Sequence, residues 1–146
     1  MHVRYTQRHP AEEAMDAAYV SLDELLAESE IVCLCCPLNE STKNLISRER
    51  LARMRRGAVL INTARGGCVD SLAVAEALRS GQLFAAGLDV YPHEPAVDPE
   101  LLACDSAVLT PHIGSADRPT RGGMASLAVA SVIDVLAGRA PRHVVR

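Results

Sequence analysis

Short apolar runs alternate with amphipathic segments along the whole chain. The apolar runs predict strands at residues 3–5, 31–35, 58–62, 84–90 and 107–109. The segments between and around them predict helices at 10–18, 21–27, 48–54, 71–80 and about 117–136. Strands and helices that alternate at this spacing form βαβ units, so we expect an α/β fold: a Rossmann-like parallel sheet with helices on both faces.

Capping residues mark where several of these helices begin and end. Ser21 followed by Glu24 forms a capping-box pattern, and Asp70 or Ser71 can cap the helix that follows the strand at 58–62. Gly81 lies where that helix should end, and Gly138 with Pro141 ends the last one. Three prolines in residues 91–99 predict a loop there.

Composition describes an ordinary folded domain and narrows the possible partners. The chain has 146 residues, of which 49% are hydrophobic, and a net charge of −3 from 15 basic and 18 acidic residues. We therefore expect one domain that binds neither nucleic acid nor a membrane. The chain has five cysteines, an odd number that does not suit a disulfide framework, so we expect small buried side chains, no metal site and a reducing cytoplasm.

Ligands bind beyond the carboxyl ends of the strands in such sheets, and three residues with useful chemistry follow the predicted strands. Arg65 can hold a carboxylate through its planar fork, and His112 beside Glu94 can act as a proton donor. This set suits the reduction of a 2-oxo acid. Each residue also has a simpler interpretation. Arg65 can belong to a turn whose glycines supply positive φ, whereas Glu94 and His112 can be solvated loop residues.

Three sequence blocks resemble the signatures of the D-isomer-specific 2-hydroxyacid dehydrogenases. They are residues 62–66 (NTARG), 87–95 (GLDVYPHEP) and 110–116 (TPHIGSA). Their order and spacing agree with that family from end to end of the chain. Residues 5–10 (YTQRHP), together with Thr120, Arg121 and Met124, resemble most closely the glyoxylate/hydroxypyruvate reductases of the family.

The resemblance implies a role for each candidate residue. Arg65 would bind the substrate carboxylate and carbonyl, His112 would be the general acid, and Glu94 would be its paired carboxylate. The substrate would be a small 2-oxo acid, glyoxylate or hydroxypyruvate, reduced to the D-2-hydroxy acid. Asp89 would contact the nicotinamide carboxamide. The expected cofactor-binding residues are Thr6, Arg8, Cys36, Pro37, Thr63, Ala64, Arg65, Asp89, His112 and Gly114.

The end of the first predicted strand bears on the choice of cofactor. NAD-specific folds place an acidic residue there for the ribose hydroxyls, whereas this chain has Thr6 followed by Arg8. A neutral residue with an arginine favours a 2′-phosphate, so NADP(H) is expected rather than NAD(H). The alternative is that Arg8 is an ordinary exposed arginine.

The sequence departs from the family in its glycine pattern and length. No G-x-G-x-x-G occurs in residues 1–146, and family members are about twice as long. We therefore expect a partial NAD(P)-binding domain that lacks the first strand, with the strand starting at Met1 and the strand at 58–62 facing each other across a gap. A homodimer is expected if the chain folds. A non-catalytic, corepressor-like binding protein and a fragment without function are the alternatives.

Overall fold

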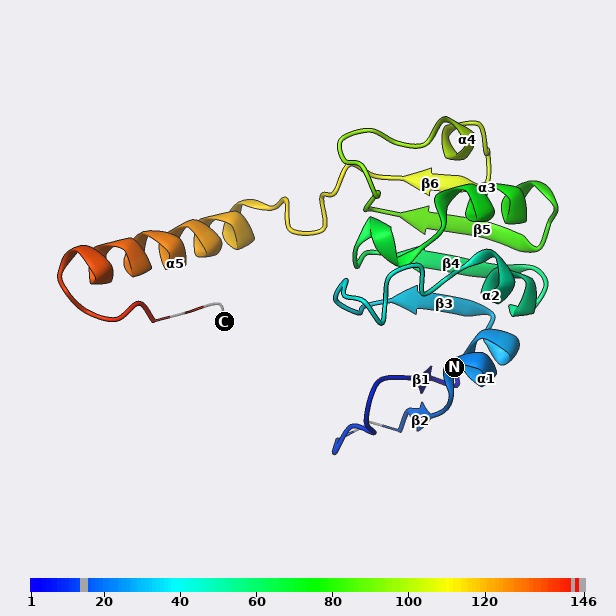
Figure 1. Cartoon of the computed structure of the whole chain (residues 1–146), viewed down its shortest axis with the longest axis horizontal. Helices are drawn as coiled ribbons and strands as arrows, with labels where there is room; N and C mark the ends of the chain where they lie inside the picture. Colours follow the sequence, from blue (N-terminus) through cyan, green and yellow to red (C-terminus); the bar gives the residue numbers. More distant parts are fainter. Residues whose placement is uncertain (14–15, 143, 145–146) are drawn as a thin grey trace. The chain divides into compact units, whose positions relative to one another are not determined.

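The computed structural model describes residues 1–13, 16–142 and 144, which divide into two compact units, Met1–Pro111 and His112–Arg146 (Figure 1). The first unit contains a four-stranded sheet in the order β3-β4-β5-β6, and every pair of neighbouring strands is parallel. These strands are β3 (Ile31–Leu34), β4 (Ala58–Asn62), β5 (Leu83–Leu88) and β6 (Ala107–Leu109). The expected α/β class with a parallel sheet is therefore confirmed.

Helices of the first unit follow the predicted caps. They are α1 (Leu22–Glu28), α2 (Arg48–Arg53), the short 3₁₀ helix η1 (Gly66–Cys68), α3 (Ser71–Arg79) and α4 (Pro99–Leu102). The Ser21 hydroxyl accepts a hydrogen bond from the Glu24 N–H, and the Asp70 carboxylate does the same for the N–H of Ala73. Gly81 takes the positive φ expected after α3. The short helix α4 was not predicted, because its start lies in the proline-rich segment.

The hydrophobic core lies between these helices and one face of the sheet. Strand register places Val32, Leu60 and Ala86 side by side on that face, and all three are buried. On the opposite face, Ile31 is 61% and Phe84 is 73% exposed. The first unit carries its own helices on one face of the sheet. Apolar side chains on the other face are what a parallel sheet with helices on both faces predicts.

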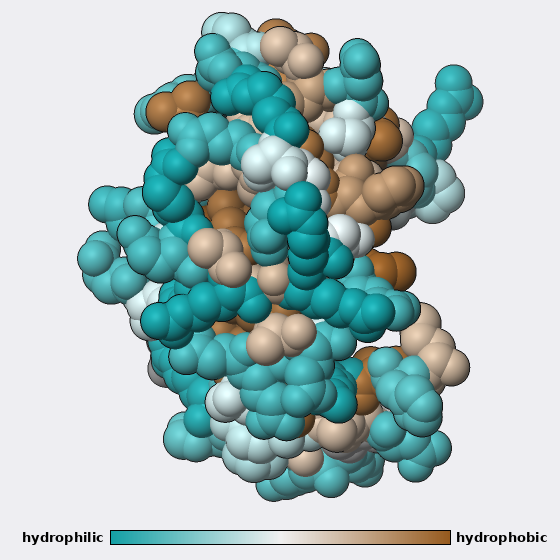
Figure 2. Space-filling view, turned by 90° about the vertical axis from the view of Figure 1, so that its right-hand side faces the viewer, coloured by the Kyte–Doolittle hydropathy of each residue, from teal (hydrophilic) through white to brown (hydrophobic). Residues whose placement is uncertain are grey.

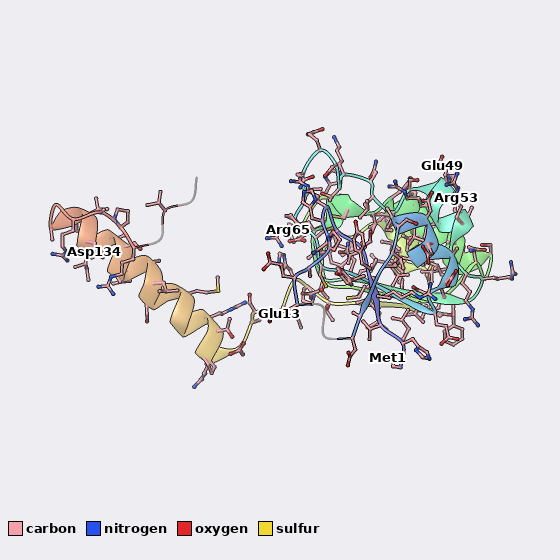
Figure 3. All side chains as sticks on the ribbon, turned by 90° about the horizontal axis from the view of Figure 1, so that it is seen from below. Met1, Glu13, Glu49, Arg53, Arg65 and Asp134 are labelled. Carbon is pink, nitrogen blue, oxygen red and sulfur yellow. The ribbon has the colours of Figure 1, made fainter. Side chains whose placement is uncertain are left out.

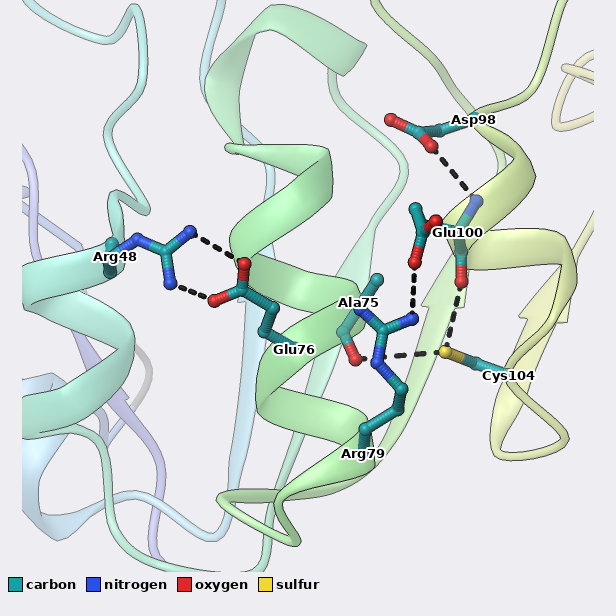
Figure 4. Close-up of polar contacts among 7 residues, drawn as sticks. All are labelled: Arg48, Ala75, Glu76, Arg79, Asp98, Glu100 and Cys104. Carbon is teal, nitrogen blue, oxygen red and sulfur yellow. Dashed lines mark hydrogen bonds and ion pairs between the residues drawn. The ribbon is translucent and has the colours of Figure 1, made fainter.

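Polar contacts join the helices of the covered face to one another (Figure 4). Arg48 of α2 forms an ion pair with Glu76 of α3, and Arg79 forms one with Glu100 of α4 at 2.6 Å. The buried Cys104 thiol lies 3.2 Å from the Glu100 carbonyl oxygen. Exposed pairs of this kind contribute little stability each, so the buried apolar side chains hold the layer together.

Two short strands near the N-terminus form a separate parallel sheet. They are β1 (Arg4–Tyr5) and β2 (Ala18–Tyr19). The predicted helix at 10–18 is wrong for the described residues, because backbone hydrogen bonds from Ala18 and Val20 to the carbonyls of Val3 and Tyr5 draw the segment into a strand. Residues 14 and 15 lie outside the described residues.

The expected position of the strand at 58–62 is also wrong. That strand, β4, pairs with β3 on one side and β5 on the other, so both of its backbone edges are used. The two edge strands of the four-stranded sheet are β3 and β6, and β3, from Ile31 to Leu34, is the edge strand beside β4. A gap beside the sheet would therefore border β3.

The second unit consists mainly of one helix, α5 (Arg118–Leu136), close to the predicted bounds of about 117–136 and capped at its start by Asp117. Its apolar side chains, including Met124 and Leu127, are exposed within this unit, whereas Asp134 is only 5% exposed. The carboxylate of Asp134 forms ion pairs with Arg139 at 2.7 Å and Arg142 at 3.2 Å. Along the described residues, α5 and the other helices are each too short or too polar to cross a bilayer.

The cysteines are free, but fewer are buried than expected. Cys68 and Cys104 are buried, whereas Cys33 and Cys35 are exposed and Cys36 is half-buried. Cys33 lies on the uncovered face of β3, which explains its exposure.

Figure 2 views the side at which the strands of the sheet begin, where hydrophilic residues prevail and hydrophobic ones gather along one margin.

Candidate active site

The loop after β4 is shaped by a buried asparagine and presents an exposed arginine. Asn62 is fully buried; its side-chain oxygen accepts a hydrogen bond from the Ala64 N–H at 3.0 Å, and its side-chain nitrogen donates to the Arg65 carbonyl at 3.1 Å. The Arg65 guanidinium is exposed and donates to the Ala64 carbonyl at 2.6 Å. In Figure 3, Arg65 lies on the opposite side of the first unit from Arg53 of α2.

Gly66 brings this loop against the loop after β5. A Cβ atom at Gly66 would lie 1.9 Å from the carbonyl carbon of Tyr91 and 2.3 Å from the nitrogen of Pro92, so only glycine fits. The requirement for glycine at position 66 does not come from a positive φ, because the glycines with positive φ are Gly57, Gly81 and Gly138. The turn interpretation of Arg65 is corrected in this respect: the glycine is required for the close approach of two backbones.

Asp89 and Glu94 lie in and near the loop that Gly66 touches. Asp89 directly follows β5 and is 8% exposed; its carboxylate accepts a hydrogen bond from the Thr110 hydroxyl at 2.5 Å. Glu94 is exposed, and its carboxylate accepts a hydrogen bond from the Tyr91 N–H at 2.9 Å. Burial, and then the negative charge of Asp89, raise the pKa of the Tyr91 phenol. Three acidic or aromatic groups are thus fixed beside the Arg65 loop.

The loop after β3 packs against the same region. The Leu38 side chain lies 3.0 Å from the position that a Cβ atom on Gly67 would take. The N–H of Asn44 donates to the Gly67 carbonyl at 2.9 Å. Burial, followed by the neighbouring Cys36 thiol, raises the pKa of Cys68. Cys36 and Pro37 therefore belong to the same edge of the sheet as Arg65.

The remaining predicted residues are distributed over three places. Thr6 and Arg8 follow β1; the threonine is half-buried and the arginine is exposed. Thr63 is exposed and Ala64 is buried, both within the Arg65 loop. His112 and Gly114 belong to the second unit, where both are exposed, and His112 has a positive φ of 53°. The structure thus brings together Arg65, Asp89, Glu94, Cys36 and Pro37, all within the first unit.

The residues at this edge suit the nicotinamide end of a dinucleotide. The Asp89 carboxylate can accept a hydrogen bond from a carboxamide, and the exposed Arg65 can bind an anion next to it. The glycine-rich motif that binds a pyrophosphate does not occur in residues 1–146. In the described ranges, no group of three or more His, Cys, Asp or Glu side chains is suited to a metal ion.

Sequence reasoning did not assign a role to three residues that shape the edge: Asn62, Tyr91 and Thr110. Asn62 and Tyr91 are buried, and their polar groups bond to the loops that carry Arg65 and Glu94. A polar residue at the end of an otherwise apolar run was the available signal, because burial of such a group requires a hydrogen-bond partner nearby.

Comparison with known proteins agrees with this geometry. The family model described as "D-isomer specific 2-hydroxyacid dehydrogenase, NAD binding domain" matches residues 1–114. The glyoxylate/hydroxypyruvate reductase B of Erwinia tasmaniensis is 51% identical over 136 residues, which cover 92% of this chain and 42% of that protein. The chain therefore spans less than half the length of this curated relative.

Solved structures show the same relationship. A glyoxylate reductase from Paecilomyes thermophila superimposes with a TM-score of 0.84 at 41% identity, over 92% of this chain and 42% of that one. A D-lactate dehydrogenase from Lactobacillus jensenii, solved with NAD+, gives a TM-score of 0.88 at 30% identity. The match covers 99% of this chain and 48% of that one. The chain therefore belongs to the D-isomer-specific 2-hydroxyacid dehydrogenases, whose NAD-binding domain it matches over residues 1–114.

Proposed function

We propose that this chain is a partial NAD(P)-binding domain of a reductase that converts a small 2-oxo acid, glyoxylate or hydroxypyruvate, into the D-2-hydroxy acid. The proposal is supported by the family to which the chain belongs and by relatives named for reduction of these two acids. The observation that carries it is the Gly66–Tyr91 contact, which holds the exposed Arg65 beside the loop of Asp89 and Glu94.

In the proposed reaction, Arg65 binds the substrate carboxylate through its guanidinium fork and polarises the neighbouring carbonyl. A reduced nicotinamide, when bound, supplies the hydride that the carbonyl carbon receives. His112 donates its proton to the carbonyl oxygen, so that the alcohol forms with charge balanced. Glu94 stabilises the protonated imidazole, and the same histidine serves as the base when the alcohol is oxidised.

We further propose that NADP(H) is preferred to NAD(H). Thr6 follows β1 where an acidic residue would serve the ribose hydroxyls of NAD, and the exposed Arg8 two residues later suits a 2′-phosphate. Asp89 contacts the carboxamide, and Cys36, Pro37, Thr63, Ala64 and Gly114 line the same cofactor. The working protein is a homodimer in the cytoplasm, where the five free cysteines stay reduced.

The test is turnover by the chain itself. Oxidation of NADPH and of NADH is followed at 340 nm with glyoxylate and with hydroxypyruvate, for the wild type, Arg65→Ala and His112→Ala. Arg53→Ala is the matched control, because Arg53 is an exposed arginine on the opposite side of the first unit. Any turnover of either acid should be abolished by both site variants and retained by the control.

Two results would contradict the proposal. Absence of any cofactor binding at millimolar NADPH or NADH would reject it for this chain. Tight cofactor binding without turnover of either acid would favour a non-catalytic binding protein.

A further inference from the structure

Tyr91 is buried between three loops of the proposed site, although it has no place in the proposed chemistry. It is 7% exposed and lies two residues beyond Asp89 and three before Glu94. Its hydroxyl lies 2.9 Å from the Leu88 carbonyl oxygen and 3.0 Å from that of Thr110. These carbonyls belong to the end of β5 and to the residue after β6, so one side chain ties two strand ends together.

The backbone of the same residue holds the other two loops. Its N–H donates to the Glu94 carboxylate at 2.9 Å. Its peptide bond to Pro92 is the surface against which Gly66 packs, one residue after Arg65. Any shift of the Tyr91 backbone therefore moves Glu94 relative to the Arg65 loop.

The hydroxyl also supports Asp89 through Thr110. The N–H of Thr110 donates to the Leu88 carbonyl at 3.0 Å, and its hydroxyl donates to Asp89 at 2.5 Å. Loss of the phenol hydroxyl would remove a donor from the Thr110 carbonyl and loosen the residue that holds Asp89. Loss of a buried hydrogen bond weakens the local structure, and a small displacement of a catalytic group lowers the rate.

We propose that Tyr91 is a positioning residue for the reaction: its hydroxyl locks the ends of β5 and β6, so that its N–H holds Glu94 beside the Arg65 loop. Its proposed role is to position Glu94 and Asp89, with no direct part in the chemistry. This inference rests on the proposed function for its consequence in catalysis, but the positioning itself can be tested without turnover.

The first arm of the experiment measures amide hydrogen exchange in the wild type and in Tyr91→Phe, which keeps the ring and removes the hydroxyl. We expect exchange to accelerate by about tenfold or more at the amides of position 91 and Thr110. The amide of Val59, which donates to the Glu30 carbonyl at the start of β4, should be unchanged. Tyr19→Phe is the matched control, because it removes a phenol hydroxyl that donates to a different carbonyl, that of Gln7.

The second arm measures kinetics in a double-mutant cycle. We expect Tyr91→Phe to lower kcat by about tenfold with KM for the 2-oxo acid within about twofold of the wild type, and Tyr19→Phe to leave kcat unchanged. In a Glu94→Gln background, Tyr91→Phe should lower kcat by less than it does in the wild type, because part of its effect acts through Glu94.

The outcomes separate this inference from the proposed function. Unchanged exchange at position 91 and Thr110 overturns the inference, as does an equal loss of kcat in the Glu94→Gln background. Accelerated exchange supports the positioning role even in a chain without turnover, a result that would contradict the proposed function instead.

Discussion

The covered face of the four-stranded sheet and its carboxyl-end edge bury different kinds of side chain. On the covered face, Val32, Leu34 and Leu60 are at most 5% exposed, and all are apolar. At the carboxyl-end edge, Asn62 at the end of β4 is fully buried, and Asp89, directly after β5, is nearly so. Burial of polar groups costs free energy unless each finds a partner, and both do.

The difference separates what holds the fold from what shapes the site. Apolar residues on the covered face gain from leaving water, so their loss should lower stability. The buried polar groups at the edge instead fix the path of the loops that carry Arg65 and Glu94. Substitutions in the two regions should therefore be distinguishable by whether they change the free energy of unfolding or the activity.

Leu60→Ala should produce the largest change in stability. Leu60 is fully buried in β4 between neighbours on both sides, so its truncation should lower the free energy of unfolding by about 2–5 kcal/mol. Urea unfolding followed by circular dichroism measures this. A loss below about 1 kcal/mol would show that the covered face is not the principal core.

Asn62→Ala should lower both the free energy of unfolding and the activity. It therefore tests how sharply the covered face and the carboxyl-end edge differ. It leaves the Ala64 N–H and the Arg65 carbonyl without their side-chain partner, at a cost of about 1–3 kcal/mol in the free energy of unfolding. It should also reduce turnover, because the Arg65 loop loses its shape. Asn62→Asp keeps the acceptor for Ala64 but sets a second oxygen against the Arg65 carbonyl in a buried position, so it should be at least as destabilising as the alanine variant. Equal activity in all three would separate Asn62 from the site.

The covered face was largely predictable from the sequence, because apolar runs such as 58–62 and capping residues such as Asp70 act locally. The edge was predictable only in part. Arg65 and Glu94 could be placed after strands, but the Gly66–Tyr91 contact depends on two loops 25 residues apart in the sequence. The strand at 18–19 was missed for the same reason: its partner, not its own pattern, makes it a strand.

Arg8→Ala should change cofactor affinity and leave stability unaltered. Removal of the exposed arginine proposed to bind a 2′-phosphate should raise the Kd for NADPH by about tenfold, which corresponds to about 1.4 kcal/mol, and leave that for NADH unchanged. Fluorescence titration of the bound reduced nicotinamide measures both constants. An equal change for the two cofactors would contradict the preference for NADP(H).

Phe84→Ser should have the smallest effect and serves as the counterpart of Leu60→Ala. Phe84 lies in the same sheet but is 73% exposed, so its removal should change the free energy of unfolding by about 0.5 kcal/mol or less. A loss comparable with that of Leu60→Ala in the same urea titration would mean that this surface is covered in solution.

The most direct test of the proposed chemistry is kcat/KM for glyoxylate in Arg65→Lys, with Arg53→Lys as control. Lysine keeps the positive charge but loses the planar fork that binds a carboxylate bidentately. We expect kcat/KM to fall by about a hundredfold or more for Arg65→Lys, with the control and both unfolding midpoints close to the wild type. Equal kcat/KM in wild type and Arg65→Lys would contradict the assignment of Arg65 as the residue that binds the substrate.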